Sequence, residues 1–241
     1  MPIDTVLFDL DGTLLPMDQD AFVKAYFHGL TAKMAAAGYA PQTLLDTMIT
    51  GIGAMVKNDG SRTNEAAFWE VFSAQYGREK CLEDQPLFEA FYREEFQSLR
   101  TVCGFQPAAS ALIRDLKARG VRVILATNPV FPAIATESRI RWAGLQPADF
   151  ERYTTFENCR FCKPNPAYYA EILEEQQVAP SSCLMVGNDV GEDMAAEKCG
   201  ISTFLLTDCL INKTGVDIAA YPHGDFAQLS QYLARAGHAN T

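Results

Sequence analysis

The sequence predicts an α/β fold, in which a doubly wound parallel sheet carries a helical bundle inserted after its first strand. Short apolar runs without polar alternation recur along the chain, as is typical of strands buried on both faces of a parallel sheet. These runs are residues 5–8, 121–126, 183–186 and 203–206. Helical periodicity fills residues 18–99, between the first run and the second. We therefore expect residues 1–16 and 104–241 to form the α/β core and residues 17–103 to form an inserted helical domain.

The inserted segment predicts a bundle of about four helices. Apolar residues recur within it at helical spacing. The stripes are Ala21, Phe22, Ala25, Tyr26, Gly29 and Leu30; Leu44, Leu45, Met48, Ile49 and Ile52; Phe68, Trp69 and Phe72; and Phe88, Phe91, Tyr92 and Phe96. Clusters of Gly, Pro and polar residues at 38–41, 57–63 and 76–80 separate the stripes and mark the ends of the helices.

Helices and strands alternate in the remainder of the chain. Pro107 opens a helix and Gly120 closes it, because Pro suits the first turn of a helix and Gly suits the position after the last. The later elements are expected as a strand at 121–126, a helix at 134–143, a weak strand at 153–156, a helix at 165–177, a strand at 183–186, a helix at 192–199, a strand at 203–206 and a final short helix around Phe226, Leu229 and Leu233. Helices of this length between strands indicate right-handed crossovers in a parallel sheet.

The composition is that of a folded globular protein and argues against several classes of partner. Of the 241 residues, 48% are hydrophobic and 21% are charged. With 20 Lys plus Arg against 30 Asp plus Glu, the net charge is −10, so we expect no nucleic-acid partner and no anionic membrane surface. The chain has no apolar run of about 18 residues that could span a membrane, and its acidic beginning is unlike a secretory signal. We therefore expect a cytoplasmic protein whose seven cysteines are reduced.

Polar residues follow three of the predicted strands at the points where those strands end. They are Asp9, Asp11, Thr127, Asn128 and Asp189, with Asp193 one helical turn further on. Because open α/β sheets bind ligands beyond the carboxyl ends of their strands, we expect these residues to converge on one edge. Carboxylates brought together in this way repel one another unless a cation lies between them. An all-oxygen set without His or Cys suits a hard divalent ion, and Mg²⁺ in particular.

A lysine adds to this set. Lys163 precedes Pro164 and Pro166 at the start of a predicted helix, where free backbone N–H groups favour an anion. A carboxylate nucleophile, a cation, a lysine and free N–H groups together suit phosphoryl transfer.

In these residues the chain resembles the haloacid dehalogenase-like (HAD) hydrolase superfamily. The four motifs of that family occur in order, as Asp9-Leu10-Asp11-Gly12-Thr13, Thr127-Asn128, Lys163-Pro164, and Gly187-Asn188-Asp189 with Asp193. The helical insertion between the first and second motifs resembles the family's C1-type cap. The resemblance thus implies a Rossmann-like HAD core with a helical cap domain over residues 17–103.

The resemblance also implies a role for each matching residue. Asp9 would attack phosphorus to form an aspartyl-phosphate. Asp11 would protonate the leaving alcohol and then activate water for the second half-reaction. Thr127 and Asn128 would hold the transferred phosphoryl oxygens, and Lys163 would neutralise charge on the nucleophile and the phosphate.

The implied cofactor is Mg²⁺. Its ligands would be the Asp9 carboxylate, the backbone carbonyl of Asp11 and the Asp189 carboxylate, with Asp193 supporting the site through water or the nearby lysine. Gly12 would let the backbone approach the phosphate closely.

The expected activity is that of a Mg²⁺-dependent phosphatase acting on a small phosphorylated metabolite. Dehalogenases proper lack the second aspartate of the first motif, so Asp11 favours phosphate esters over carbon–halogen bonds. A phosphomutase of a sugar phosphate shares all four motifs and remains an alternative. A non-catalytic phosphate-binding regulatory module is a further alternative. Four intact residues argue against it: Asp9, Asp11, Lys163 and Asp189.

Simpler explanations exist for single features. Asp-x-Asp-Gly alone is also a common turn sequence, and each Asn or Asp after a strand could merely cap a helix. Cys159 and Cys162 form a C-x-x-C pair, but no second pair or nearby His would complete a zinc site, so incidental cysteines are favoured. The loop 57–62 is expected to be a solvated connector; the alternative is that Lys57 or Arg62 binds a second anionic group of the substrate.

Overall fold

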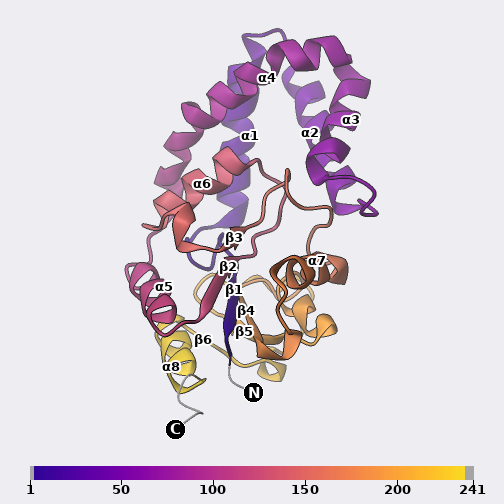
Figure 1. Ribbon diagram of the computed structural model, residues 1–241. Coiled ribbons are helices and arrows are strands. Elements are labelled where there is room, and N and C mark those ends of the chain that lie inside the picture. Colours follow the sequence, from indigo (N-terminus) through magenta and orange to yellow (C-terminus); the bar gives the residue numbers. More distant parts are fainter. Residues whose placement is uncertain (1–2, 237–241) are drawn as a thin grey trace.

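A computed structural model describes residues 3–236 and contains one sheet of six parallel strands (Figure 1). The strands are β1 (Thr5–Phe8), β2 (Arg122–Leu125), β3 (Arg152–Tyr153), β4 (Cys183–Gly187), β5 (Ser202–Leu206) and β6 (His223–Gly224). Their order across the sheet is β3-β2-β1-β4-β5-β6. The central strand β1 therefore pairs with β2 on one side and with β4 on the other. The predicted α/β fold with a parallel sheet is confirmed.

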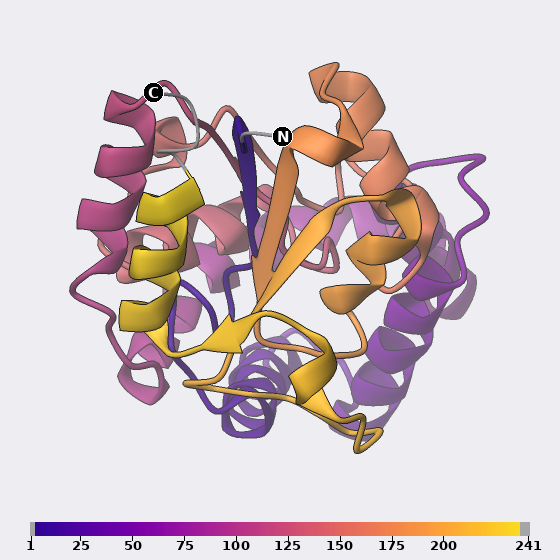
Figure 2. The same cartoon turned by 90° about the horizontal axis from the view of Figure 1, so that it is seen from below.

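Helices cover both faces of the sheet (Figure 2). They are α5 (Ala109–Ala118), α7 (Pro166–Gln176) and α8 (Phe226–Ala236), whereas α6 (Ala133–Trp142) lies beyond the carboxyl ends of the strands (Figure 1). The faces are distinguished by alternate residues of β1. Val6 and Phe8 pack in one buried cluster with residues of α5 and α8, whereas Leu7 packs in another with residues of α7. This alternation explains the continuous apolar run in β1, because both of its faces are buried.

Four α-helices lie between β1 and α5 in the chain, in the segment where a bundle of about four helices was predicted. They are α1 (Gln19–Ala35), α2 (Pro41–Val56), α3 (Asn64–Tyr76) and α4 (Arg78–Arg93), and a 3₁₀ segment at Glu95–Val102 leads back to the core. Asp18 and Thr63 cap α1 and α3 by accepting backbone N–H groups. Figure 1 shows these helices beyond the carboxyl ends of the strands. In that position they lie over the edge where ligands bind in open α/β sheets.

The two chain passages that join these helices to the sheet run side by side. Met17 and Cys103 form an isolated antiparallel bridge, and the Gly104 N–H donates to the Pro16 carbonyl at 2.7 Å.

Two of the predicted elements differ from those observed, and one observed strand was not predicted. The segment expected as a helix at 192–199 is a 3₁₀ segment at Met194–Cys199, where the Ala196 N–H donates to the Asp193 carbonyl three residues before it. The weak strand expected at 153–156 is β3 at Arg152–Tyr153, since the Asn158 side chain binds the backbone of Tyr153 and Thr155 and turns the chain. The two-residue β6 was not predicted, because no apolar run marks it.

Other predicted elements are confirmed. The final helix is present as α8, in which Phe226, Leu229 and Leu233 are buried. No helix within residues 3–236 has the length and apolar character needed to cross a membrane.

Candidate active site

The ends of β1, β2 and β4 bring three of the predicted motifs together. The Asp9 N–H donates to the Val186 carbonyl at 2.9 Å, which continues the pairing of β1 with β4 past the last residue of β1. On the other side, the Ala126 N–H donates to the Phe8 carbonyl at 2.7 Å. Asp9 therefore leaves the sheet between the segments that begin at Thr127 and at Gly187. The topology places these residues on one edge, as the sequence predicted.

Lys163 joins this edge through two buried ion pairs. Its side chain is only 1% exposed, and Nζ lies 2.9 Å from Asp9 Oδ1 and 2.6 Å from Asp193 Oδ1. Burial disfavours the charge of Lys163, but the carboxylates of Asp193 and Asp9 outweigh it and raise the pKa of the lysine well above its usual range. Burial also raises the pKa of the Asp9 carboxyl, against the opposite influence of Lys163. The lysine is thus a fixed positive charge beside Asp9.

Asp193 positions both the lysine and the loop that follows β4. Its Oδ2 accepts the Asp189 N–H at 2.9 Å, while Oδ1 binds Lys163. A Cβ at Gly187 would lie 2.1 Å from the Asp193 carboxylate, so the approach of that carboxylate requires glycine. Asp189 Oδ1 accepts two N–H groups of its own loop, and within residues 3–236 its Oδ2 accepts no hydrogen bond.

Asp11 is paired with an arginine that the sequence analysis did not single out. Arg139, on α6, is 1% exposed, and its Nη1 forms an ion pair with Asp11 Oδ2. The pKa of Asp11 is raised by burial, while the charge of Arg139 acts in the opposite direction. The other oxygen, Asp11 Oδ1, is buried and has no hydrogen-bond partner in the described chain. A buried acceptor without a partner costs free energy, which favours a ligand at this position.

The second motif presents Asn128 to the same region. The Thr127 carbonyl accepts hydrogen bonds from Thr154 Oγ1 at 2.6 Å and Tyr168 Oη at 2.9 Å, and these bonds fix the turn after β2. Asn128 Nδ2 donates to Glu192 Oε2 at 3.0 Å, and Asn128 Oδ1 is a second buried oxygen that has no hydrogen-bond partner within residues 3–236. Glu192 is also new to the site, and burial raises its pKa to about 7.

Gly12 is required by its neighbours. Its φ of +84° lies in the left-handed region, and a Cβ would lie 2.3 Å from Asn188 Nδ2. Asn188 is held in place, because its Oδ1 accepts from Thr13 Oγ1 at 3.0 Å and its Nδ2 donates to the Cys209 carbonyl at 2.7 Å. Gly12 thus lets the first and fourth motifs pack together, and its predicted approach to phosphate stays a prediction.

The donor set fits a hard cation. No group of three or more His, Cys, Asp or Glu side chains in residues 3–236 is arranged as a metal centre. The predicted Mg²⁺ set needs only two side chains, Asp9 and Asp189, together with the Asp11 carbonyl. Asp189 Oδ2 lacks a hydrogen bond, and all the donors are oxygen, the ligand type that Mg²⁺ prefers. The residues present are therefore compatible with that ion.

The sequence of the whole site region matches a family. The family model of the haloacid dehalogenase-like hydrolases matches residues 3–200. The chain belongs to this hydrolase family.

Relatives of this HAD hydrolase carry phosphatase names. It is 26% identical over 239 residues to the glyceraldehyde 3-phosphate phosphatase of Methanothermobacter thermautotrophicus, covering 96% of this chain and 100% of the relative. It is 25% identical over 206 residues to the phosphoglycolate phosphatase of Vibrio vulnificus, covering 85% and 84%. It is also 25% identical over 202 residues to pyrophosphatase PpaX of Bacillus velezensis, covering 83% and 82%. All three names indicate a substrate that contains phosphate, but the group that carries the phosphate differs between them.

Solved structures show the same fold. The HAD phosphatase from Thermococcus onnurineus superposes with a TM-score of 0.56 at 17% identity, covering 97% of this chain and 98% of that one. The HAD-hydrolase YfnB from Bacillus subtilis, bound to magnesium, also gives a TM-score of 0.56, at 18% identity and with 97% and 99% coverage.

Two features outside the four motifs of this hydrolase are placed by the structure. The thiols of Cys159 and Cys162 are buried, and burial raises the pKa of each to about 12. In the loop 57–62, Lys57 and Arg62 are exposed, and Arg62 forms an ion pair with Glu70. The suggestion that Lys57 or Arg62 binds a second anionic group of the substrate stays a prediction.

Sequence reasoning missed Arg139 and Glu192. A weak signal existed for Arg139, because it occupies a helical position four residues after Ala135 and three before Trp142, both of which are buried. A charged residue on the apolar face of a helix calls for a buried partner. Glu192 lies directly before Asp193 and gives no comparable signal.

Proposed function

We propose that this hydrolase is a Mg²⁺-dependent phosphatase of a small phosphorylated metabolite, and that it acts through a phosphoryl group carried on Asp9. The observation that carries the proposal is the buried Lys163, 2.9 Å from Asp9 at the ends of the strands. A buried lysine that holds one oxygen of a carboxylate offers both a nucleophile and a positive charge for an incoming phosphate. The phosphatase names of three relatives support the same class of substrate.

Two transfers make up the proposed reaction. A carboxylate oxygen of Asp9 attacks phosphorus, the bond from phosphorus to the ester oxygen breaks, and the leaving alcohol takes a proton from the Asp11 carboxyl. In the second transfer Asp11 accepts a proton from water, the water oxygen attacks phosphorus, and Asp9 is released together with inorganic phosphate. Asp11 thus loses its proton in the first transfer and regains one in the second, so the enzyme returns to its starting state.

The surroundings of these residues suit the two roles. Arg139 holds Asp11 Oδ2, which leaves Oδ1 for proton exchange with the alcohol or water. Lys163 is fixed by Asp193 and needs no rearrangement as charge develops on the phosphoryl oxygens. Asn128 and Thr127 lie on the same edge and are proposed to hold those oxygens.

The residues proposed to hold Mg²⁺ are Asp9, the Asp11 carbonyl and Asp189, with Asp193 in support. When bound, the ion would orient the phosphate and neutralise part of its charge.

We also propose that residues 17–103 form a cap of the C1 type over this site. The side-by-side passages at Met17 and Cys103 give this segment a narrow attachment to the core. A second attachment is Asn64 at the start of α3, whose buried side chain donates to the carbonyls of Pro129 and Phe161 at 3.3 Å each. The cap thereby contacts the loops that follow both Asn128 and Cys159.

The test uses p-nitrophenyl phosphate as a generic ester. Asp9→Asn is expected to lower kcat by about 10³-fold or more, because it removes the nucleophile. The matched control Asp20→Asn changes an exposed carboxylate on α1 and should retain activity. EDTA should abolish turnover, added Mg²⁺ should restore it, and Asp189→Asn should raise the Mg²⁺ concentration needed by about 10-fold or more. Full activity of Asp9→Asn, or full activity in EDTA, would contradict the proposal.

A further inference from the structure

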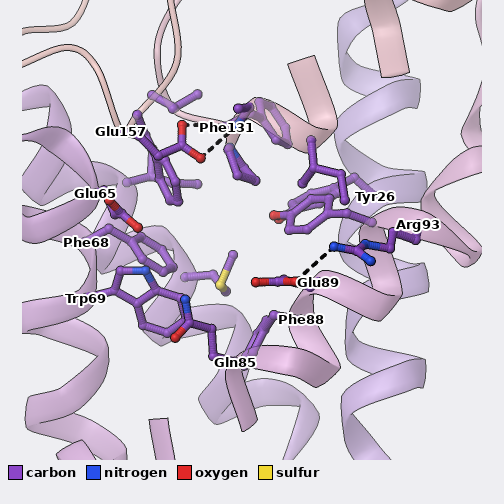
Figure 3. Close-up of a pocket in the computed structure, with 18 residues that line it drawn as sticks. Tyr26, Glu65, Phe68, Trp69, Gln85, Phe88, Glu89, Arg93, Phe131 and Glu157 are labelled. Atoms are coloured by element: carbon purple, nitrogen blue, oxygen red, sulfur yellow. Dashed lines mark hydrogen bonds and ion pairs between the residues drawn. The ribbon is translucent and has the colours of Figure 1, made fainter. Parts of the chain in front are cut away.

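A cavity of about 340 Å³ lies between the cap helices and the core (Figure 3). Helices α1 to α4 line it on one side, and the core segments 130–134 and 156–157 line it on the other. Those two segments follow β2 and β3, so the cavity lies beyond the carboxyl ends of these strands. Its volume is at the lower end of the range for small-molecule sites and suits a compact organic group.

The cavity adjoins the proposed catalytic residues through one loop. That loop begins at Asn128, and Phe131 within it lines the cavity. The ring of Phe131 also lies 4.5 Å from Cζ of Arg139, the residue that pairs with Asp11. The Phe131 ring and the Arg139 guanidinium therefore connect the wall of the cavity with Asp11, the proposed acid of the reaction.

Aromatic rings form much of the cavity wall. Figure 3 shows Phe68, Trp69 and Phe88 from the cap around the space, with Phe131 on the core side. Trp69 packs edge-on against both Phe68 and Phe88, with ring centroids 5.4 and 5.8 Å apart. Rings that support one another in this way present fixed faces, and aromatic faces attract organic cations.

The charged groups at the cavity are predominantly negative. Three carboxylates line it, those of Glu65, Glu89 and Glu157, against the single cation Arg93. Arg93 is paired with Glu89 at 3.2 Å, and this pair is exposed. Within residues 3–236, neither Glu65 nor Glu157 forms an ion pair, and Figure 3 shows both on the same side of the cavity. Two unpaired negative charges therefore face an aromatic space.

The two unpaired carboxylates differ in their other contacts. Glu157 accepts the Ala133 N–H with both oxygens, at 2.9 and 3.0 Å, and so caps α6. Glu65 begins α3 next to Asn64, and its pKa is raised by partial burial and by the charge of Glu157. A positive charge between them would offset this repulsion.

We propose that this cavity binds the alcohol portion of the substrate and that this portion carries an organic ammonium group. The inference rests on the proposed phosphatase function and adds the class of substrate, a phosphate monoester of an amino alcohol or a quaternary ammonium alcohol. Glu65 and Glu157 supply the opposite charge, and the faces of Trp69 and Phe131 supply cation–π contacts. The phosphate end of the substrate would lie at the positive charge of Lys163, and the ammonium end would lie at the negative charges of Glu65 and Glu157.

A pair of esters with the same shape tests the proposal. Choline phosphate and 3,3-dimethylbutyl phosphate differ by a quaternary nitrogen in place of a quaternary carbon. We expect kcat/KM of the wild-type enzyme to favour choline phosphate by about tenfold or more. Glu65→Gln should reduce that preference at least about fivefold, and Glu70→Gln, an exposed position on the same helix outside the cavity, should leave it unchanged. Equal kcat/KM values for the two esters, or a preference that survives in Glu65→Gln, would overturn the proposal.

A binding measurement separates this inference from the proposed function. Trp69 lines the cavity, and in a Trp142→Phe background it is the one remaining tryptophan of the sequence. Choline should change its fluorescence, 3,3-dimethylbutan-1-ol at the same concentration should change it much less, and Glu65→Gln should weaken the response to choline. With no hydrolysis of p-nitrophenyl phosphate but a charge-dependent response, the phosphatase function fails and the cation site stands. With hydrolysis but no such response, the cation site fails alone.

Discussion

Arg139 and Asp11 form a buried ion pair although 128 residues separate them in the chain. Arg139 comes from α6 and is almost fully buried, so its charge has few other partners. Its Nε lies 3.4 Å from the Ala135 carbonyl, and its Nη2 donates to Thr136 Oγ1 at 3.3 Å. The remaining face of the guanidinium lies against the Phe131 ring. This arrangement fixes the direction of the Asp11 side chain.

A double-mutant cycle on this pair measures how strongly the two residues depend on each other. Arg139→Met leaves a carboxylate in a poorly solvated site, and Asp11→Asn leaves a buried guanidinium without its counter-charge. Each single change is expected to destabilise the protein, and the double variant should be more stable than their sum predicts by about 2 kcal/mol. Urea unfolding of the four proteins gives this coupling energy.

The same cycle has a control within the chain. Arg141 lies on the same helix and pairs with Glu137 on the exposed side, at 2.9 Å. The corresponding cycle with Arg141→Met and Glu137→Gln should give a coupling energy below about 0.5 kcal/mol, as for other exposed pairs. Equal coupling energies in the two cycles would show that burial does not strengthen the pair of Arg139 with Asp11.

Gly12 and Gly38 allow a matched test of why the first motif contains glycine. Both have φ of +84°, but a Cβ at Gly38 would meet nothing within 4 Å, whereas one at Gly12 would meet the Asn188 amide at 2.3 Å. Gly38→Ala should therefore cost only the backbone penalty of about 1 kcal/mol and keep full activity. Gly12→Ala must also displace Asn188, so it should cost more and lower kcat/KM.

Thermal unfolding and turnover of p-nitrophenyl phosphate, measured on both variants, decide the matter. Similar stability and similar activity of the two variants would indicate that the contact with Asn188 has no consequence.

The fold explains which residues of the candidate site could be located from the sequence. Asp9 and Asp189 were predictable because each follows a strand, and parallel neighbours must bring their carboxyl ends to one edge. Arg139 and Asn64 could not be predicted in this way, because their contacts depend on how α6 and α3 pack against loops distant in sequence. The cavity could not be predicted either, because it also depends on this packing. The aromatic stripes of the cap give the same apolar pattern whether they face a core or a ligand.

A local side-chain bond explains why β3 is shorter than the strand expected at 153–156. The Asn158 side chain accepts the Thr155 N–H and donates to the Tyr153 carbonyl, so the chain turns after two strand residues. A periodicity argument does not detect this competition between a side chain and the sheet.

The C-x-x-C pair gives a last prediction, which concerns its reactivity. Thiolate is the reactive form of cysteine, and with a pKa of about 12 the thiols of Cys159 and Cys162 should carry about 10³-fold less thiolate at pH 8 than an exposed cysteine. Their burial also excludes reagents. In the native protein at pH 8, iodoacetamide should therefore label Cys199 and Cys209, which are partly exposed, well before Cys159 and Cys162.

Mass spectrometry of peptides after timed labelling checks this order. Unfolding in urea should remove the difference, because all seven cysteines are then exposed to the reagent. Rapid native labelling of Cys162 would instead indicate an activated thiol next to Lys163 in the chain, and a redox role for the pair would then replace the explanation that the two cysteines are incidental.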